Sequence, residues 1–303
     1  MKKTTMKDIA LRANVSVATV SYVLNRVGNQ TIPEKTRNQI MQLAEELHYI
    51  PNLAARSLAN RRTGLVGVLV NTSVNMPYWK LHSQFSFIRS LEQRLTAAGY
   101  HTLLYSLDAE KPSLDIIIER KLEAVFLIDV RDESFYSISQ HFVEGIPLIL
   151  IDSLIEDKLF KQVLFNYRSA LGKIMPEDPS KVCLIMESYN NSLLARYIRD
   201  SLPLPDDAVF MVQNQEELDN ILQGQQFQEA IIINEFMGSY AQKAGSFERL
   251  YVVCTCNCPQ ILGEQVQKVT FSGDKTAAAF ELMTDLLNRS NYAEQENNRI
   301  FVE

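Results

Sequence analysis

A stripe of small, uncharged side chains near the N-terminus has the composition of a surface that contacts the edges of DNA bases. It consists of Val17, Ala18, Ser21, Tyr22 and Asn25, which share one face if this segment is helical. Hydroxyl and amide groups can bond base edges in the major groove, and apolar side chains can contact the thymine methyl group. The same pattern also fits an ordinary helical hairpin with a solvated face, so the stripe alone leaves both interpretations open.

Two short helices joined by a tight turn are predicted to carry this stripe within residues 4–25. Thr5 and Asp8 have the spacing of a capping box at the start of the first helix. Asn14 suits the left-handed residue that ends it, and Ser16 can cap the second helix. Apolar residues at helical spacing predict a buried stripe on each helix. They are Met6, Ile9, Ala10 and Ala13 in the first helix and Val20, Val23, Leu24 and Val27 in the second.

A third helix and a short fourth one are predicted after this pair. Pro33 suits the first turn of the third helix, because its missing N–H has no partner to lose there. Four apolar residues on that helix, Ile40, Leu43, Ala44 and Leu47, would close a three-helix core. Pro51 then stops the helix, and Asn52 can cap the segment LAARSLAN. A helix of about two turns is marginal alone in water.

The segments DIALRANVSVATVSYVLN, TIPEKTRNQIMQLAEELHYIPN and LAARSLAN resemble the start of the LacI-GalR family of bacterial transcriptional regulators. The resemblance is strong over residues 4–62 and weaker beyond them. It implies an N-terminal all-α helix-turn-helix domain of the lambda-repressor type at 1–49, and a hinge helix and linker at 50–62. In the family a hinge leucine wedges into the minor groove of operator DNA, and Leu58 holds that position here. A plain interdomain linker helix is the alternative interpretation of the hinge.

The DNA-binding residues that follow from the stripe and the resemblance come from the first two helices and the hinge. They are Thr5, Ser16, Val17, Ala18, Thr19, Ser21, Tyr22, Asn25, Asn52, Ala55, Arg56 and Leu58. The family often has arginine, which can bond guanine through two donors, where this chain has Tyr22. We therefore expect base readout through methyl contacts and DNA shape, on double-stranded operator DNA with an inverted repeat.

Charge is distributed unevenly along the chain. Residues 1–62 hold ten basic and four acidic side chains, a net charge of +6. Because the whole chain has a net charge of −6, the remaining residues carry a net charge of −12. A basic head on an acidic body is the electrostatic pattern of a DNA-reading module joined to another domain. No apolar run reaches the roughly 18 residues that span a membrane, and the N-terminus does not resemble a signal peptide. We expect a cytoplasmic protein without membrane contact.

The body predicts an α/β fold. Apolar runs at 65–70, 101–105, 124–129 and 148–152 alternate with helical patterns, and a second set lies at 182–186, 209–212, 230–233, 251–254 and 269–271. Such alternation favours parallel sheets covered on both faces. Two sets indicate two lobes, which resemble the periplasmic-binding-protein-like effector domain of the family. We expect this effector-binding and dimerisation domain at 63–303, with lobe one at about 63–162 and 273–293 and lobe two at about 163–272 and 294–303.

Candidate effector contacts lie where strands end, because open α/β sheets bind ligands beyond the carboxyl ends of their strands. This rule covers residues 186–190 and 254–257 among others, and together with the resemblance it selects Tyr78, Trp79, Asp129, Asp152, Arg196, Asn234 and Glu235. Tyr78 and Trp79 resemble the family's aromatic platform after the first strand. A packing role is an equal alternative for each residue.

Several family features of the effector domain are missing. Arg199 stands where the family's glycine follows Arg196, and the segment Cys254-Thr255-Cys256 replaces its Gly-Tyr-Asp. Three nearby cysteines, Cys254, Cys256 and Cys258, would share one face of a strand, but their spacing does not match a standard zinc site. We predict buried small residues there rather than a metal or redox site, and no cofactor.

Two functions remain open for a chain of this design. The first is a homodimeric repressor of a metabolic operon, controlled by a small sugar-like effector. The second is a DNA-binding regulator whose degenerate cleft serves dimerisation or a protein partner without a small effector. An enzyme is disfavoured, because the four histidines are scattered and neither a phosphate-binding glycine loop nor a nucleophile elbow is present.

Overall fold

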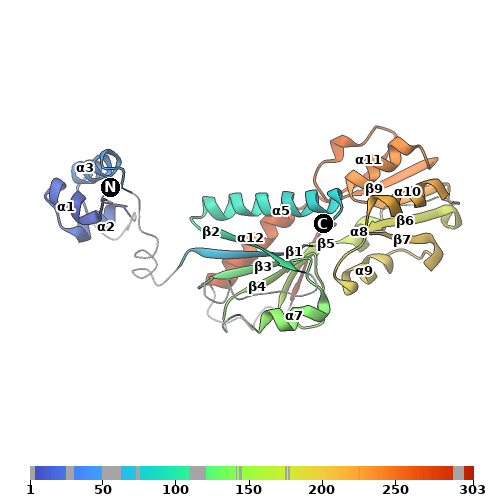
Figure 1. The fold of residues 1–303 in the computed structure, drawn as a ribbon, viewed down its shortest axis with the longest axis horizontal. Coiled ribbons are helices and arrows are strands. Elements are labelled where there is room, and N and C mark those ends of the chain that lie inside the picture. The colour runs from blue at the N-terminus through green and yellow to red at the C-terminus, as the bar shows by residue number, and fades with distance from the viewer. Residues whose placement is uncertain are drawn as a thin grey trace. The chain divides into compact units, whose positions relative to one another are not determined.

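The structure of the protein is a computed structural model that describes residues 4–24, 31–49, 63–72, 76–108, 121–140, 142, 145–174, 176, 178–224, 226–288 and 297–303. The chain divides into two compact units, Met1–Thr63 and Gly64–Glu303. Each unit has its own hydrophobic core and is described separately (Figure 1).

The described part of the N-terminal unit contains three helices, α1 (Met6–Ala13), α2 (Val17–Leu24) and α3 (Glu34–Glu46). The backbone N–H of Thr5 donates to the Asp8 carboxylate at 2.8 Å, which caps α1. Asn14 ends this helix in the left-handed region with φ of 52°. The hydroxyl of Ser16 accepts from the Thr19 N–H at 3.0 Å and caps α2. The expected helix boundaries are confirmed at these three ends.

The core of this unit is small and closed by all three helices. Ile9 of α1, Val20 of α2 and Ile40 of α3 have no exposed surface. Met6, Leu24, Leu43, Ala44 and Leu47 pack around them. The predicted inward residue Val27 lies outside the described residues. The apolar spacing of the sequence therefore determines which face of each helix is buried.

The C-terminal unit contains two parallel sheets, each at the centre of one lobe. The six-stranded sheet of the first lobe has the order β11-β5-β4-β3-β1-β2, and the five-stranded sheet of the second lobe has the order β10-β9-β8-β6-β7. The first sheet comprises β1 (Leu65–Thr72), β2 (His101–Asp108), β3 (Ala124–Ile128), β4 (Leu148–Ile151), β5 (Lys161–Phe165) and β11 (Arg299–Val302). The second comprises β6 (Val182–Glu187), β7 (Val209–Val212), β8 (Glu229–Ile233), β9 (Arg249–Cys254) and β10 (Gln267–Thr270).

Helices cover both faces of each sheet (Figure 1). In the first lobe, α5 (Tyr78–Ala97) and α12 (Lys275–Asn288) pack together on one face, and α7 (Asp132–Ser139) packs on the other. In the second lobe, α10 (Gln215–Gly224) and α11 (Glu235–Ala244) cover one face. The short helix α8 (Tyr167–Leu171) and α9 (Ser192–Arg199) join the other face. The remaining described elements are three short 3₁₀ helices, η1 (Pro179–Lys181), η2 (Asp206–Ala208) and η3 (Pro259–Ile261).

One hydrophobic cluster is continuous across the two lobes. It joins Val68 and Phe126 of the first sheet to Leu184 and Ile231 of the second. The two lobes therefore share apolar packing, as well as the polar contacts described below. No helix among the described residues is long and apolar enough to cross a membrane.

The structure corrects the expected division of the C-terminal segments between the lobes. The sequence predicts that the second lobe begins at about residue 163 and includes residues 294–303. Instead β11 pairs in parallel with β5, with Arg299 opposite Gln162, and both strands belong to the six-stranded sheet of the first lobe. The reason is burial, because Val163 and Leu164 are completely enclosed in the core that this sheet builds.

Candidate nucleic-acid interface and interlobe cleft

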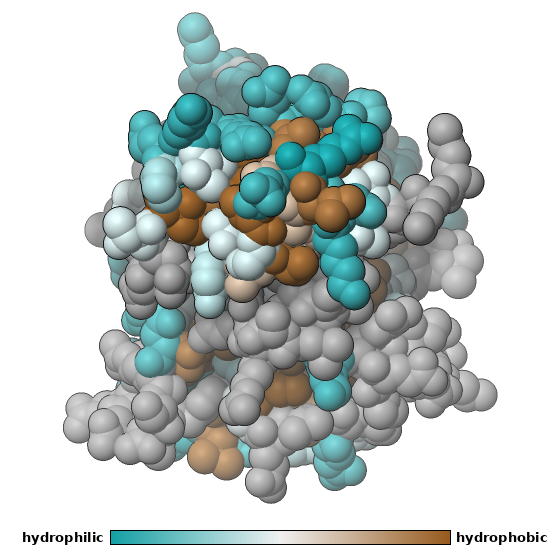
Figure 2. All heavy atoms as spheres, turned by 90° about the vertical axis from the view of Figure 1, so that its left-hand side faces the viewer, coloured by the Kyte–Doolittle hydropathy of each residue, from teal (hydrophilic) through white to brown (hydrophobic). Residues whose placement is uncertain are grey.

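The candidate base-reading stripe lies on the solvent side of α2. Val17 is 41% exposed and Tyr22 is 37% exposed, whereas Val20 and Val23 on the opposite side are buried. Ala18 is also exposed, and Ser21 is partly buried. Figure 2, which is turned toward the N-terminal unit, shows hydrophobic residues among hydrophilic ones on its surface. The exposed face of α2 thus combines methyl-bearing and hydroxyl-bearing side chains, as contact with base edges requires.

Other predicted DNA contacts have local structural partners or lie outside the description. The hydroxyls of Ser16 and Thr19 are 2.9 Å apart at the start of α2, and Thr5 is engaged with Asp8. These hydroxyls stand at helix N-termini, where backbone N–H groups favour phosphate oxygens. Asn25, Asn52, Ala55, Arg56 and Leu58 lie outside the described residues.

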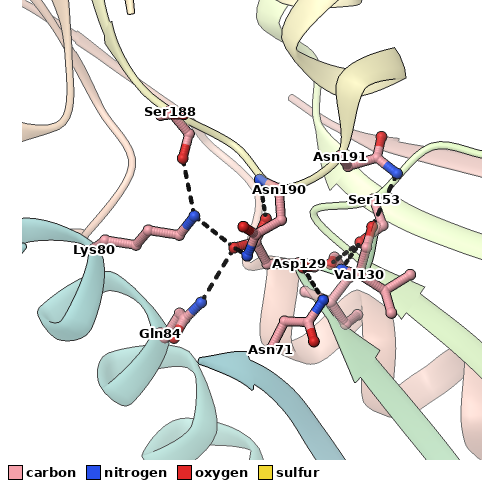
Figure 3. Close-up of polar contacts among 10 residues, drawn as sticks. Asn71, Lys80, Gln84, Asp129, Val130, Ser153, Ser188, Asn190 and Asn191 are labelled. Carbon is pink, nitrogen blue, oxygen red and sulfur yellow. Dashed lines mark hydrogen bonds and ion pairs between the residues drawn. The ribbon is translucent and has the colours of Figure 1, made fainter. Parts of the chain in front are cut away.

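A polar network fills the seam between the two lobes of the body and centres on Asp129, directly after β3 (Figure 3). Its carboxylate lies 2.6 Å from the ammonium nitrogen of Lys80, which projects from α5. From the second lobe, Asn190 donates to the same carboxylate through its backbone N–H at 3.1 Å and its side-chain amide at 2.8 Å. Lys80 also donates to the carbonyl of Ser188 at 3.0 Å. One buried ion pair of the first lobe thus holds two residues of the second.

Asn191 makes a second junction beside this one. Its amide nitrogen donates to the carbonyls of Val130 at 3.1 Å and Leu154 at 3.0 Å, both in the first lobe. Its side-chain oxygen accepts from the N–H of Leu154 and also caps α9 through the N–H of Leu194. Asn191 has no exposed surface. Its side chain therefore couples the start of α9 directly to the loops that follow β3 and β4 (Figure 3).

Buried charges crowd this seam. Burial raises the pKa of Asp129 above its ordinary value, although Lys80 and the hydrogen bonds of Asn190 act in the opposite direction. Burial raises the pKa of Glu187, at the end of β6, to about 7. Lys275 at the start of α12 pairs with Asp152, and its ammonium lies 4.3 Å from the ring centroid of Phe165. The seam consequently holds opposite charges at close range, away from bulk water.

The predicted effector residues do not gather around one open site. Trp79 has no exposed surface and packs in the core of the second lobe, so it offers no free ring face for stacking. Asn234 is also completely buried and caps α11 through the Phe236 N–H. Arg196 is exposed on α9, and Tyr78 is 41% exposed on α5. Only Asp129 and Asp152 of the predicted set lie in the charged seam.

Glu235 has a structural partner set of its own. Its buried carboxylate accepts from the backbone N–H groups of Thr255, Cys256 and Cys258, at 2.8, 2.9 and 3.0 Å. Only Cys254 of the three clustered cysteines lies in a strand; the others follow in the loop that Glu235 fixes. Burial, followed by the Glu235 charge, raises the thiol pKa of Cys258 to about 11. Among the described residues, no group of three or more His, Cys, Asp and Glu could hold a metal ion.

Two of the cavities lined by the described residues open between the lobes and contain parts of the charged seam. The larger, of about 720 Å³, is lined by residues of both lobes, including Lys80, Arg131, Glu187, Asn190 and Gln213. The smaller, of about 280 Å³, lies between α5 and the loop at residues 254–259 and includes Phe165 and Lys275. The rule for strand ends covers residues 186–190, which include Glu187 and Asn190, but the sequence did not single out Lys80 or Lys275. Their only signal is a charged residue beside a helix start, which is common in sequences.

Comparison with known proteins identifies the N-terminal unit. The family described as "Bacterial regulatory proteins, lacI family" matches residues 5–52. A catabolite control protein A of Staphylococcus epidermidis is 34% identical over 128 residues, which cover 41% of this chain and 36% of that protein. The HTH-type transcriptional regulator pepR1 of Lactobacillus delbrueckii subsp. lactis is 26% identical over 206 residues, which cover 64% of this chain and 58% of that protein. The chain thus spans only about a third to a half of the length of the catabolite control proteins that it matches.

Solved structures match the fold along nearly the whole chain. A Lac repressor bound to ONPG in the repressed state has a TM-score of 0.72 at 16% identity, covering 99% of this chain and 97% of that one. A complex of the transcriptional regulator CelR with cellobiose has a TM-score of 0.55 at 15% identity, with 99% and 97% covered. The helix-turn-helix unit followed by a two-lobed α/β domain is therefore the fold of these regulators.

Proposed function

We propose that this chain, whose residues 5–52 match the lacI family of bacterial regulatory proteins, is a member of that family and a sequence-specific DNA-binding repressor of a metabolic operon. The observation that carries the proposal is the exposed face of α2, where Val17 and Tyr22 stand free above a fully closed core. An exposed apolar and hydroxyl-bearing helix face on a basic head suits the major groove. A protein that acts on the bacterial chromosome works in the cytoplasm.

The assembly that we propose is a homodimer, which would read an inverted repeat with two heads. A row of exposed apolar side chains on α5 supports it, since Tyr78, Leu81 and Phe85 are 41%, 56% and 60% exposed. Their spacing puts them on one side of the helix. Leu104, 53% exposed, stands on β2, the edge strand that α5 packs against. A self-complementary surface of this kind suits a two-fold axis.

The body, in this proposal, is the sensor. A small sugar-like effector would bind between the lobes, change the network around Asp129 and Asn190, and so alter the geometry of the dimer. Ligand and DNA affinities are then linked by equal factors in both directions. The CelR complex with cellobiose is a protein of the same fold that binds a sugar.

Operator selection followed by release tests the proposal. The purified full-length protein is mixed with random duplexes, and the bound sequences are recovered and sequenced. We expect a two-fold symmetric site, and we expect one compound from a panel of sugars and phosphosugars to release it. Recovery of sequences without two-fold symmetry would reject the dimeric reader, and indifference to all compounds would reject the sugar-like effector.

A further inference from the structure

The wall of the larger interlobe cavity includes a buried glutamate with a carboxylate oxygen that no described residue bonds. Glu187 lines this cavity and is 6% exposed. Its Oε2 atom is enclosed and has no hydrogen-bond partner among the described residues. A buried carboxylate oxygen without a donor is unfavourable, because burial removes water and nothing replaces it. The described residues therefore supply no hydrogen-bond donor to this oxygen of Glu187.

The lysines near Glu187 are committed elsewhere. Asp129, Asp152 and Glu187 interact electrostatically in this seam with Lys80 and Lys275. Lys80 pairs with Asp129, and Lys275 pairs with Asp152. This group therefore contains three carboxylates but only two ammonium groups. Glu187 is the carboxylate that has no ion pair within the group. The missing donor is best supplied by a third cation, because a charged donor bonds a carboxylate most strongly.

The rest of the cavity suits hydroxyl groups rather than apolar ones. Ser188, Asn190, Ser192, Gln213 and Asn214 contribute hydroxyls, amides or polar backbone to its wall. Arg131, Asp132 and Glu133 also line it, one positive and two negative side chains. They are more exposed than Glu187, so solvent screens them more strongly. A cavity of about 720 Å³ has room for a sugar-sized ligand.

We propose that this cavity binds a small hydroxylated primary amine of the amino-sugar class, whose ammonium group bonds Glu187. The hydroxyl groups of the ligand bond the amides and hydroxyls of the wall. The inference rests on the proposed function of the body as a sensor and narrows its effector from sugars in general to cationic ones. Lobe closure would then depend on a cation at Glu187 in the same way that it depends on Lys80 at Asp129.

Matched pairs of ligands test this inference on the full-length protein. Glucosamine is compared with glucose, and galactosamine with galactose, by calorimetric titration at pH 7. We expect at least one amino sugar to bind about tenfold or more tightly than its neutral partner, the effect of one charge-assisted hydrogen bond. N-acetylglucosamine, whose nitrogen is uncharged, should bind no better than glucose. The inference would be overturned if each amino sugar bound only as tightly as its neutral partner, or if neither amino sugar bound. It would also be overturned if binding required a carboxylate on the ligand.

Two variants identify the carboxylate responsible. Glu187→Gln keeps the size of the side chain and should abolish the preference for the amine. Glu133→Gln removes an exposed carboxylate of the same cavity and should preserve the preference. Thermal melting verifies that each variant is folded, and if Glu187→Gln fails to fold, the ligand pairs on the natural protein still decide. A preference that survives Glu187→Gln would also overturn the inference.

Operator binding separates this inference from the proposed function. Suppose that the protein binds an inverted repeat, and that neutral sugars release the protein from DNA as well as amino sugars do. The proposed function is then supported and the proposed amine site is rejected. If amino sugars bind but no operator is found, the amine site is supported and the proposed function as a DNA-binding repressor is rejected.

Discussion

The ammonium nitrogen of Lys80 lies 2.6 Å from Oδ2 of Asp129, and these side chains are only 10% and 5% exposed. Both residues belong to the first lobe, one on α5 and the other directly after β3. The second lobe approaches them through the carbonyl of Ser188 and the two donors of Asn190. Both members of this ion pair therefore bond the second lobe: the cation bonds a carbonyl oxygen, and the anion accepts two N–H groups.

Replacing Lys80 should destabilise the body strongly. In Lys80→Met the Asp129 carboxylate stays buried without its cation, and such a loss costs about 3–5 kcal/mol. Urea unfolding of the natural and variant proteins measures the difference. The double variant with Asp129→Asn should recover part of the loss, because no buried charge is left.

The matched control is an ion pair in solvent. Arg94 and Asp274 also form an ion pair, but their side chains are 40% and 50% exposed. Arg94→Gln should change the free energy of unfolding by less than about 1 kcal/mol. Equal costs for Lys80→Met and Arg94→Gln would contradict the role given to the buried pair.

Glu187 should make the stability of the body depend on pH. Its pKa rises from an ordinary value of 4.5 to about 7 in the folded protein, chiefly through burial. The groups that face it are Lys80 of α5, Asp129 and Asp152 after strands, Lys275 of α12, Tyr167 of α8, Tyr189 and Cys256. Between these pH values the folded state keeps a proton that the unfolded state has lost. The Glu187 contribution to the free energy of unfolding therefore falls as pH rises through this window.

The variant Glu187→Gln isolates this contribution, since glutamine does not titrate. Relative to the natural protein, it should gain on the order of 3 kcal/mol in free energy of unfolding between pH 4.5 and pH 7.5. Urea unfolding at a series of pH values gives the difference, in which the other titrating groups cancel. Glu133→Gln, at an exposed position, should show no such trend. A constant difference for Glu187→Gln at all pH values would argue against a raised pKa.

Local patterns in the sequence were sufficient for the helical head and for most strands. Ile9, Val20 and Ile40 are completely buried because their spacing leaves each helix only one apolar face. The strand β5 was less visible, because two of its residues, Lys161 and Gln162, are polar. Gln162 is nevertheless completely buried, since its amide bonds the backbone of Ile155 in both directions. Hydropathy cannot reveal a polar residue that the fold has satisfied internally.

The interlobe seam shows where sequence reasoning ends. The rule for strand ends selected Asp129 and Asp152, which lie in the seam, although their role as ligand contacts stays a prediction. It could not select Lys80 or Lys275, because these residues arrive from helices whose position depends on tertiary packing. Trp79 was expected beside the ligand as an aromatic surface. It is buried instead because the start of α5 reaches into the core of the second lobe.

The apolar row on α5 predicts how the protein can be made monomeric. Phe85→Glu would place a charge in the proposed two-fold interface, where it has no partner and loses water. We expect sedimentation to give a monomer, with weaker binding to an inverted repeat at the same protein concentration because two heads no longer bind together. Tyr136→Glu is the control, since Tyr136 is 49% exposed on α7, across the sheet from α5. A dimer of unchanged affinity in Phe85→Glu would exclude α5 as its interface.

Tyr22 should determine part of the base sequence that the protein prefers. Its ring is 37% exposed on α2, so Tyr22→Ala should leave the fold of the head intact. We expect this variant to lose about 1–3 kcal/mol of discrimination at one base pair in each half-site, the usual cost of one base contact. Binding to a set of operators with single substitutions measures it. From the sequence we expect Arg61, just after the hinge segment, to contact DNA phosphate. Arg61→Ala should therefore weaken binding to every sequence and reduce its dependence on salt, because phosphate contacts carry no sequence information. If Tyr22→Ala weakened all operators equally, Tyr22 would be a backbone contact and the base-reading face of α2 would have to be sought elsewhere.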